Sequence, residues 1–183
     1  YSYAADQAAA DAIAAGESQN DVFVYTITDG TQDNTANITI KVLGANDNPS
    51  AQNDVGVVNE GSTLTVQNSA NANVDGSFDA NGEHSGDVIH TTSSSHKDSD
   101  LDTNDTLRIT QIKKSGGDNS SVSSGSSYNS SGTSVTGSYG TLTIGADGSY
   151  TYVASSDISG LSDGATVSDT FTYTLSDGTA TTT

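Results

Sequence analysis

Several stretches of the chain alternate apolar and polar residues, which is the pattern of a strand with one buried face. The alternating apolar positions are Phe23, Tyr25 and Ile27; Ile38, Ile40 and Val42; Leu64 and Val66; Leu107 and Ile109; Leu142 and Ile144; and Phe171, Tyr173 and Leu175. Asp-Gly pairs between strands favour tight turns, and Asp147-Gly148 is expected to close a hairpin. Many short strands separated by turns predict an all-β, antiparallel β-sandwich.

One segment has the composition of a helix. Residues 4–15 are rich in alanine, a strong helix former, and they are followed by Gly16. The counterpart of this segment at 155–161 has a weaker helix propensity, so we expect at most one short helix. Residues 67–97 and 115–134 are rich in Ser, Gly and Asn, and we predict that they form long loops.

The chain contains an internal repeat. The segment Asp21–Thr31 recurs as Asp169–Thr179 at an offset of 148 residues, because 169 − 21 = 148. Likewise, Tyr1–Tyr3 recurs as Tyr150–Tyr152 at an offset of 149 residues, because 150 − 1 = 149. We therefore expect the chain to start late in one module and to stop at nearly the same point of the next.

The expected boundary between the modules contains Pro49, the single proline of the chain. We predict that residues 1–43 are the C-terminal part of one repeat module and that residues 44–54 form a junction. Residues 55–183 would then be the next module. At the repeat offset, the copy of the strand around Ile40 falls beyond the last residue, so this second module is expected to lack its last strand.

The charge of the chain limits the classes of function. It has 23 acidic and 5 basic residues, a net charge of −18, and all but three of its acids are aspartates, which favour turns, caps and cation-binding loops. Few basic side chains are present to replace phosphate counterions, which argues against nucleic-acid binding. No apolar run approaches the ~20 residues that span a bilayer, so no membrane insertion is expected. The chain has no cysteine, which excludes disulfides and thiolate zinc sites and makes bound metal a candidate source of stability.

The densest supply of calcium ligands is a short acidic run. Ca²⁺ takes six to eight oxygen ligands, usually from a loop. Asp98, Asp100 and Asp102 alternate along the chain, and Asn104 or Asp105 would complete the shell. Without a cation, two carboxylates 4 Å apart repel by ~1 kcal/mol even in water, and a bound cation converts this cost into attraction. The sequence therefore predicts a Ca²⁺ site here, and a solvated acidic turn is the alternative interpretation.

Three segments together resemble a known family. The residues Gly140–Tyr152 and Asp169–Gly178 look like the VCBS repeat of Gram-negative bacteria, and so does the junction Gly44–Pro49. Such repeats are similar in fold to bacterial cadherin-like domains and occur in giant RTX-type surface adhesins. The resemblance implies an Ig/cadherin-like β-sandwich repeat located outside the cell, on the bacterial surface. It implies an extension or adhesion module rather than an enzyme.

The same resemblance indicates a second calcium site at the junction. Cadherins bind Ca²⁺ between domains through the motif Asp-x-Asn-Asp-Asn, and this chain has Gly44 where the first Asp would be. The candidate ligands that the resemblance implies are Asn46, Asp47, Asn48, Asp54 and Glu60. The missing carboxylate puts a full multi-calcium cluster in doubt, and a polar turn that ends at proline is the alternative.

No residue pattern in the sequence indicates catalysis. We find no Gly-x-Ser-x-Gly elbow, no phosphate-binding loop and no distinguished carboxylate pair of the glycosidase type, so we predict no catalytic residues. His84, His90 and His96 are six residues apart. On a strand they would share one face and form a transition-metal site, but in a loop they are more simply solvated.

Two functional hypotheses from different classes follow. The first is a structural and adhesive repeat whose Ca²⁺ sites stiffen a chain of modules, with neighbouring repeats of the same protein as its partners. The second is a module that binds a glycan or a cell-surface protein through the loops 67–97 and 115–134. These loops contain only two aromatic residues, Phe78 and Tyr128, which argues against a surface on which sugars stack.

The incomplete second module also raises the possibility of self-assembly. A strand without its neighbour exposes an edge that recruits other strands. The expected donor positions are Ile38, Ile40 and Val42, and the expected acceptor positions are Phe171, Tyr173 and Leu175 of another copy. Such head-to-tail donation would extend into a filament. The alternative is that the neighbouring residues belong to a longer protein.

Overall fold

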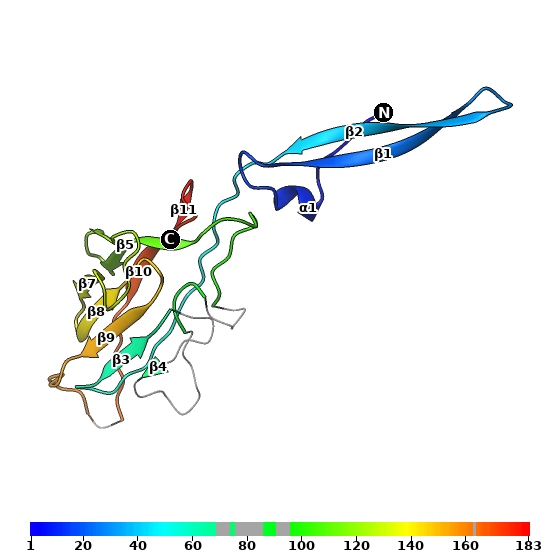
Figure 1. The fold of residues 1–183 in the computed structure, drawn as a ribbon. Helices are drawn as coiled ribbons and strands as arrows, with labels where there is room; N and C mark the ends of the chain where they lie inside the picture. Colours follow the sequence, from blue (N-terminus) through cyan, green and yellow to red (C-terminus); the bar gives the residue numbers. More distant parts are fainter. Residues whose placement is uncertain (69–73, 76–85, 91–95, 163) are drawn as a thin grey trace. The chain divides into compact units, whose positions relative to one another are not determined.

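The computed structural model describes residues 1–68, 74–75, 86–90, 96–162 and 164–183 (Figure 1). These residues form antiparallel β-sheets with one short helix, which confirms the predicted all-β class. The chain divides into two compact units. The first unit comprises Tyr1–Asp47 and Leu101–Asp105, and the second comprises Asn48–Asp100 and Thr106–Thr183.

The first unit is built on a long hairpin. Its strands are β1 (Ser18–Thr28) and β2 (Asp33–Leu43), which pair along their whole length. The helix α1 (Ala8–Asp11) lies within the predicted segment 4–15 and is only one turn long. Gly16, with a φ of 86°, follows this segment in a conformation that favours glycine. The hairpin is a sheet of only two strands, and an isolated sheet of this size is marginally stable in water.

The tip of the hairpin is closed by an aspartate turn. The backbone N–H groups of Thr31 and Gln32 donate to Asp29 Oδ1 at 2.8 and 2.9 Å, and Gly30 has a φ of 92°. The hydrogen bond from the Thr31 hydroxyl, followed by those from the two backbone N–H groups, lowers the pKa of Asp29 to about 2. The carboxylate form therefore closes this turn throughout the neutral range.

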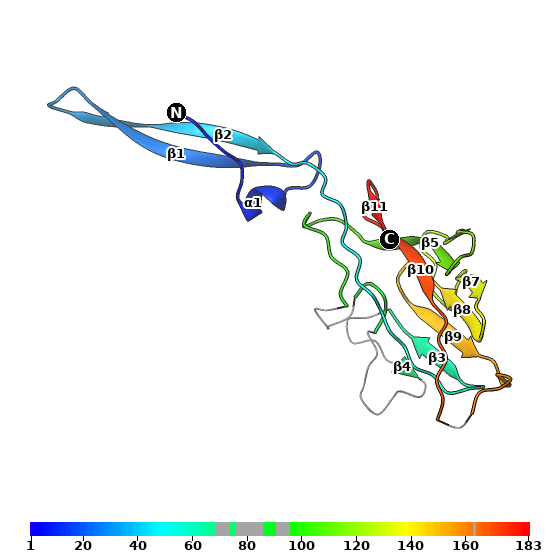
Figure 2. The ribbon, with the colours of Figure 1, turned by 180° about the vertical axis from the view of Figure 1, so that it is seen from behind.

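The second unit contains two sheets (Figures 1 and 2). One sheet has the strand order β11-β10-β5-β6, and the other has the order β4-β3-β9-β8-β7. The strands are β3 (Thr63–Val66), β4 (Val74–Asp75), β5 (Arg108–Lys114), β6 (Ser120–Ser121), β7 (Thr133–Thr136), β8 (Gly140–Ile144), β9 (Tyr150–Ala154), β10 (Phe171–Ser176) and β11 (Thr181–Thr182). The predicted hairpin around Asp147-Gly148 is formed by β8 and β9.

Both sheets of the second unit contribute to one apolar core. Its buried side chains include Leu64, Val66, Ile109, Ile112, Leu142, Ile144 and Leu175. Burial alternates along β8, as expected for a strand with one face toward the core. Each such aliphatic side chain contributes about 1.5–3 kcal/mol when it leaves water. The two sheets therefore form a β-sandwich-like arrangement around this core.

The internal repeat of the sequence is also a structural repeat. In the first unit, Ile27 pairs with Asn34; in the second, Leu175 pairs with Thr182. Each second-unit residue lies 148 positions after its counterpart, because 175 − 27 = 148 and 182 − 34 = 148. The aspartate turn recurs as well, since Asp177 Oδ1 accepts the backbone N–H groups two and three residues later, as the carboxylate in the first unit does. Strand β11 therefore has the position of the start of β2.

The segment 115–134 is less irregular than the sequence predicted. Ser120–Ser121 form β6, which pairs with β5, and Thr133 begins β7. Backbone pairing and the hydrogen bond from the Thr133 hydroxyl to the Ser121 carbonyl oxygen hold these short strands, so they form without a long apolar alternation. The counterpart of α1 at 155–161 contains a turn and no helix, in agreement with its weaker propensity. Within the described residues, no helix has the length and hydropathy needed to cross a membrane.

The core assignment predicts a contrast between two positions on neighbouring strands. Ile144 is 1% exposed on β8, whereas Val153 is 50% exposed on β9. Ile144→Ala should lower the free energy of unfolding of the second unit by about 2–5 kcal/mol, because it leaves a cavity in the core. Val153→Ala should change it by less than about 0.5 kcal/mol. Denaturant titration measures both values, and equal effects would contradict the assigned core.

Candidate metal centre

The structure distributes the predicted calcium ligands over both units. In the first unit are Asn46, Asp47, Asp102, Asn104 and Asp105. In the second unit are Asn48, Asp54, Glu60, Asp98 and Asp100. The predicted run of alternating aspartates is thus divided after Asp100, and each part is best considered within its own unit.

The most oxygen-rich point of the second unit is the hydroxyl group of Tyr173 on β10. This phenol oxygen lies 3.2 and 3.1 Å from the two carboxylate oxygens of Asp98 and 3.1 Å from Asp54 Oδ2. The backbone carbonyl oxygens of Gln52 and Val88 lie 2.9 and 3.5 Å from it. Three separate segments of the chain therefore place oxygen atoms around one side chain.

The hydroxyl group has a single proton for these five acceptors. It can donate to only one of them at a time with good geometry. Asp98 also accepts the backbone N–H of Gln52 at 2.7 Å, and its side chain is only 2% exposed. A hard cation or an additional proton would balance the negative charge of such an oxygen set.

The surroundings of Asp98 favour its protonated form. Burial raises the pKa of this carboxyl group to about 6, and the negative charge of Asp87 acts in the same direction. Hydrogen bonds from Gln52 and Tyr173 oppose the increase. Burial, followed by the charges of Asp54 and Asp98, also raises the pKa of Tyr173, so its phenol remains a donor at neutral pH. The buried group at this site that changes charge in the mildly acidic range is Asp98.

Asp87 is a fully buried carboxylate that the sequence analysis did not single out. Its Oδ1 accepts the backbone N–H groups of Ile89 and His90 at 2.8 and 2.6 Å and lies 3.3 Å from His90 Nδ1. Burial opposes its ionisation, but the hydrogen bonds from His90 and Ile89 leave its pKa below the ordinary value. The side-chain hydrogen bond to Asp87 raises the pKa of His90 in turn. Asp87 therefore closes a turn with its own local donors.

The three histidines that could have formed a transition-metal site have different surroundings. His90 contacts Asp87, and His96 Nδ1 lies 2.5 Å from the carbonyl oxygen of Asn53. His84 lies outside the described residues. The one group of three metal-ligating side chains found within the described residues contains only aspartates. Oxygen ligands of this kind suit hard cations rather than soft transition metals.

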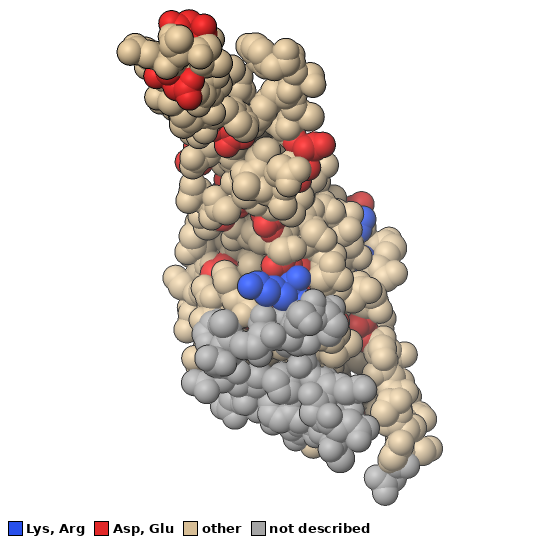
Figure 3. Space-filling view, turned by 90° about the vertical axis from the view of Figure 1, so that its right-hand side faces the viewer, with Lys and Arg blue, Asp and Glu red and all other residues tan. Residues whose placement is uncertain are grey.

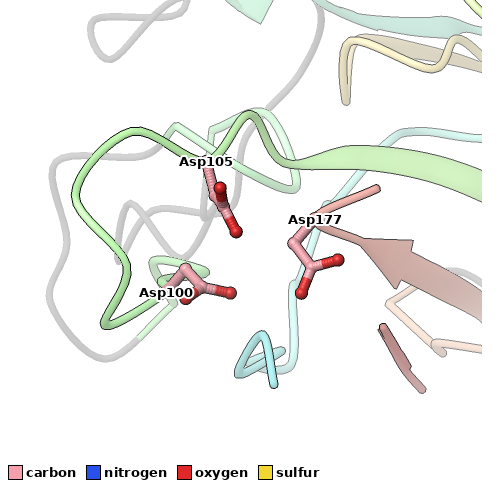
Figure 4. Close-up of side chains that lie close together, drawn as sticks. All are labelled: Asp100, Asp105 and Asp177. Carbon is pink, nitrogen blue, oxygen red and sulfur yellow. The ribbon is translucent and has the colours of Figure 1, made fainter. Parts of the chain in front are cut away.

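A second pair of carboxylates in the second unit belongs to Asp100 and Asp177 (Figure 4). One carboxylate oxygen of Asp100 lies within 4.8 Å of one carboxylate oxygen of Asp177. Asp177 comes from the repeated turn between β10 and β11, where its Oδ1 accepts the backbone N–H groups of Thr179 and Ala180. Figure 4 also draws Asp105, the last residue of the segment that groups with the first unit. The Asp-Gly repeat was the available sequence signal for Asp177, but it indicated a turn rather than a ligand.

The segment 101–105 is held within the first unit by several hydrogen bonds. Asp102 is 4% exposed, and its Oδ2 accepts the backbone N–H of Asp47 at 2.8 Å. The Asn104 side chain donates to both carboxylate oxygens of Glu17 at 3.0 and 3.2 Å. Asp102 and Asp47, which the sequence assigned to two separate candidate sites, thus lie in direct contact. The side-chain amide of Asn104 contacts Glu17, which was not among the predicted ligands.

Two further predicted ligands make hydrogen bonds with backbone groups. Glu60 Oε1 accepts the backbone N–H of Ile158 at 2.6 Å, which ties the start of the second unit to the loop after β9. The Asn46 side chain donates to the carbonyl oxygen of Asp47 at 2.5 Å. Elsewhere, on the face drawn in Figure 3, acidic side chains are dispersed and basic ones are few. The candidate centre is therefore distinguished by burial and geometry, not by a concentration of surface charge.

No protein-family model matches the chain, and no significant match exists among the curated proteins or the solved structures compared with it. The resemblance to VCBS repeats accordingly depends on the sequence motifs alone.

The raised pKa of Asp98 predicts a pH-dependent stability without calcium. The unfolded carboxyl group ionises near pH 3.9, whereas the folded group ionises near 6. As the pH rises from 4 to 7, the wild-type protein should therefore lose stability relative to Asp98→Asn, by about 2 kcal/mol. Urea titrations in excess chelator measure the difference at each pH.

A control substitution distinguishes an effect of the Asp98 environment from the general effect of removing one negative charge. Asp118 is exposed, so Asp118→Asn removes a carboxylate at a distance from the core. We expect this variant to differ from the wild type by less than about 0.5 kcal/mol at each pH. Parallel pH curves for the wild type and Asp98→Asn would contradict the assigned environment of Asp98.

Proposed function

We propose that this chain is an extracellular, calcium-binding structural and adhesion repeat that extends and stiffens a bacterial surface protein. The observation that carries the proposal is the partly buried oxygen set around Tyr173, which combines the carboxylates of Asp54 and Asp98 with backbone carbonyl groups. The acidic composition, the absence of cysteine and the internal repeat support the same conclusion. The proposed role is mechanical, with no catalytic step.

Calcium fits this oxygen set better than other common cations. Ca²⁺ accepts six to eight oxygens in an irregular geometry, whereas Mg²⁺ requires a near-ideal octahedron and retains several waters. Asp54 and Asp98 would supply charged ligands, and the Gln52 carbonyl a neutral one. Water would complete the shell. Extracellular modules bind Ca²⁺ at ~10⁻⁴–10⁻³ M, a range that suits a site with few charged ligands.

Bound calcium would stabilise the connection between the junction and the sandwich. Gln52 and Asp54 lie at the end of the predicted junction 44–54, whereas Tyr173 lies on β10 and Asp98 follows a long connection. A cation held by these segments would anchor the start of the second unit to its core strand. It would also offset the cost of ionising Asp98 in a buried position.

The alternative of a ligand-binding module has less support. Part of the segment 67–97 lies outside the described residues, so it contributes no argument. The segment 115–134 contains paired strand residues and a single aromatic side chain, Tyr128, which is half-buried. A stacking platform for sugars needs exposed aromatic faces. We therefore retain the structural role as the proposal.

Calcium should raise the thermal stability of the second unit. At a concentration 100 times the dissociation constant, one site contributes ~2.7 kcal/mol. This corresponds to an increase of several degrees in the melting temperature for a protein of this size. Calorimetry in calcium and in excess chelator measures the difference. An unchanged melting temperature would contradict the proposal.

Variants locate the response at the proposed site. Asp54→Asn and Asp98→Asn should each remove most of the calcium-dependent increase, because each eliminates a charged ligand. Asp118→Asn should retain the full increase, since Asp118 is exposed and lies outside the site. An equal response in all three variants would place the ion elsewhere in the chain.

A further inference from the structure

The hairpin of the first unit exposes an apolar face. Phe23, Tyr25 and Ile27 lie on one face of β1 and are 50%, 43% and 58% exposed. Phe23 pairs directly with Ile38 on β2, so the apolar face continues across both strands. Contiguous exposed apolar surface in a soluble protein marks an interaction site. The strand register thus defines a surface whose residues all point to one side of a two-stranded sheet.

The same strand recurs in the second unit, where its apolar face is covered. The counterpart of Ile27 at the repeat offset is Leu175, which is 0% exposed. Phe171 and Tyr173, the other two counterparts, pack against the core that contains Leu64 and further side chains of the β4-β3-β9-β8-β7 sheet. The two units therefore differ in the neighbours of this strand: in the second, β5 pairs with it and a five-stranded sheet lies against it.

An aromatic and carboxylate contact shows that the two strands occupy equivalent positions. The residues are Tyr3, Asp21 and Phe23 in the first unit and Tyr152, Asp169 and Phe171 in the second. The ring centroids are 6.2 Å apart at 72° in the first unit and 6.3 Å apart at 66° in the second. In each unit the tyrosine hydroxyl donates to the aspartate, at 2.5 and 2.6 Å respectively. The first unit therefore already has the contact that joins β9 to β10 in a complete sandwich.

The tyrosine of this contact also indicates how the covering sheet would attach. In the second unit, Tyr152 belongs to β9, which pairs with β3 on one side and β8 on the other. Its counterpart Tyr3 lies in the segment 1–3, which is not part of a strand in the first unit. A sheet that covered the hairpin face would thus gain residues 1–3 as one of its strands. Both edges of that strand would be available for pairing with neighbouring strands, as the edges of β9 are in the second unit.

We propose that the apolar face of the hairpin is the docking surface for a β-sheet layer of the kind formed by β4-β3-β9-β8-β7, with residues 1–3 in the position of β9. The occupant is a polypeptide with alternating Leu, Ile and Val residues directed at the face, similar in sequence to residues 48–149. The second unit of another copy does not fit, because its own β5 and β10 already cover that sheet. The inference depends on the repeat organisation of the proposed function and not on calcium.

The test supplies the missing layer within the same polypeptide. A copy of residues 48–149 is placed directly before Tyr1 of the full chain, and hydrogen exchange is followed by mass spectrometry. We expect amide exchange in β1 and in residues 1–3 to slow by about tenfold or more, toward the rates of β10 and β9. Unchanged exchange in these segments would overturn the proposal, and so would a copy that gained no protection of its own.

Two substitutions on opposite faces of β1 make the test specific. Ile27→Lys places a charge on the proposed docking face and should abolish the added protection in the extended protein. Val24→Lys changes a residue that is 67% exposed on the opposite face and should preserve it. Equal effects of the two substitutions would overturn the proposal. The calcium experiment tests Asp54 and Asp98 of the second unit, whereas hydrogen exchange tests β1 and residues 1–3 of the first unit. A negative result in one experiment therefore does not contradict the proposal that the other experiment tests.

Discussion

The structure depends on one constraint, which is that each apolar sheet face must be covered by a second sheet. In the second unit this requirement is met, since β5 and β10 share a core with β3 and β8. In the first unit the equivalent of β10 has only its hairpin partner. A strand with the same sequence pattern is therefore fully buried at Leu175 and mostly exposed at Ile27. The difference arises from neighbours rather than from the strand itself.

The candidate metal centre depends on the same constraint. Tyr173 projects from β10, and the oxygens that surround its hydroxyl come from segments that the sandwich brings together. Its counterpart in the first unit is Tyr25. Tyr25 is 43% exposed on a sheet of only two strands. Assembly of the oxygen set therefore requires a complete two-sheet unit, which couples the proposed cation binding to folding.

Much of the fold could be predicted because its signals are local. A period of two in the apolar residues identified the strands that contain Ile27, Ile109, Leu142 and Leu175, and these strands are present. The Asp-Gly turn at Asp29 has the same hydrogen bonds in both copies, since its donors lie within three residues of the carboxylate. Alanine content likewise located the only helix of the described residues, although propensity alone did not show that it would be a single turn.

The sequence by itself thus determined the fold class, the repeat and the kind of ligand atoms that the chain offers. Tertiary structure decided which of these atoms meet. Asp100 and Asp102, only two positions apart, fall into different units, whereas Asp98 and Tyr173 lie in contact although 75 positions separate them. Sequence spacing describes distances only along a strand or turn, but a buried oxygen set is assembled by the packing of distant segments. Side-chain periodicity therefore predicted the strands, and only the packed sandwich showed that these oxygens surround a tyrosine hydroxyl.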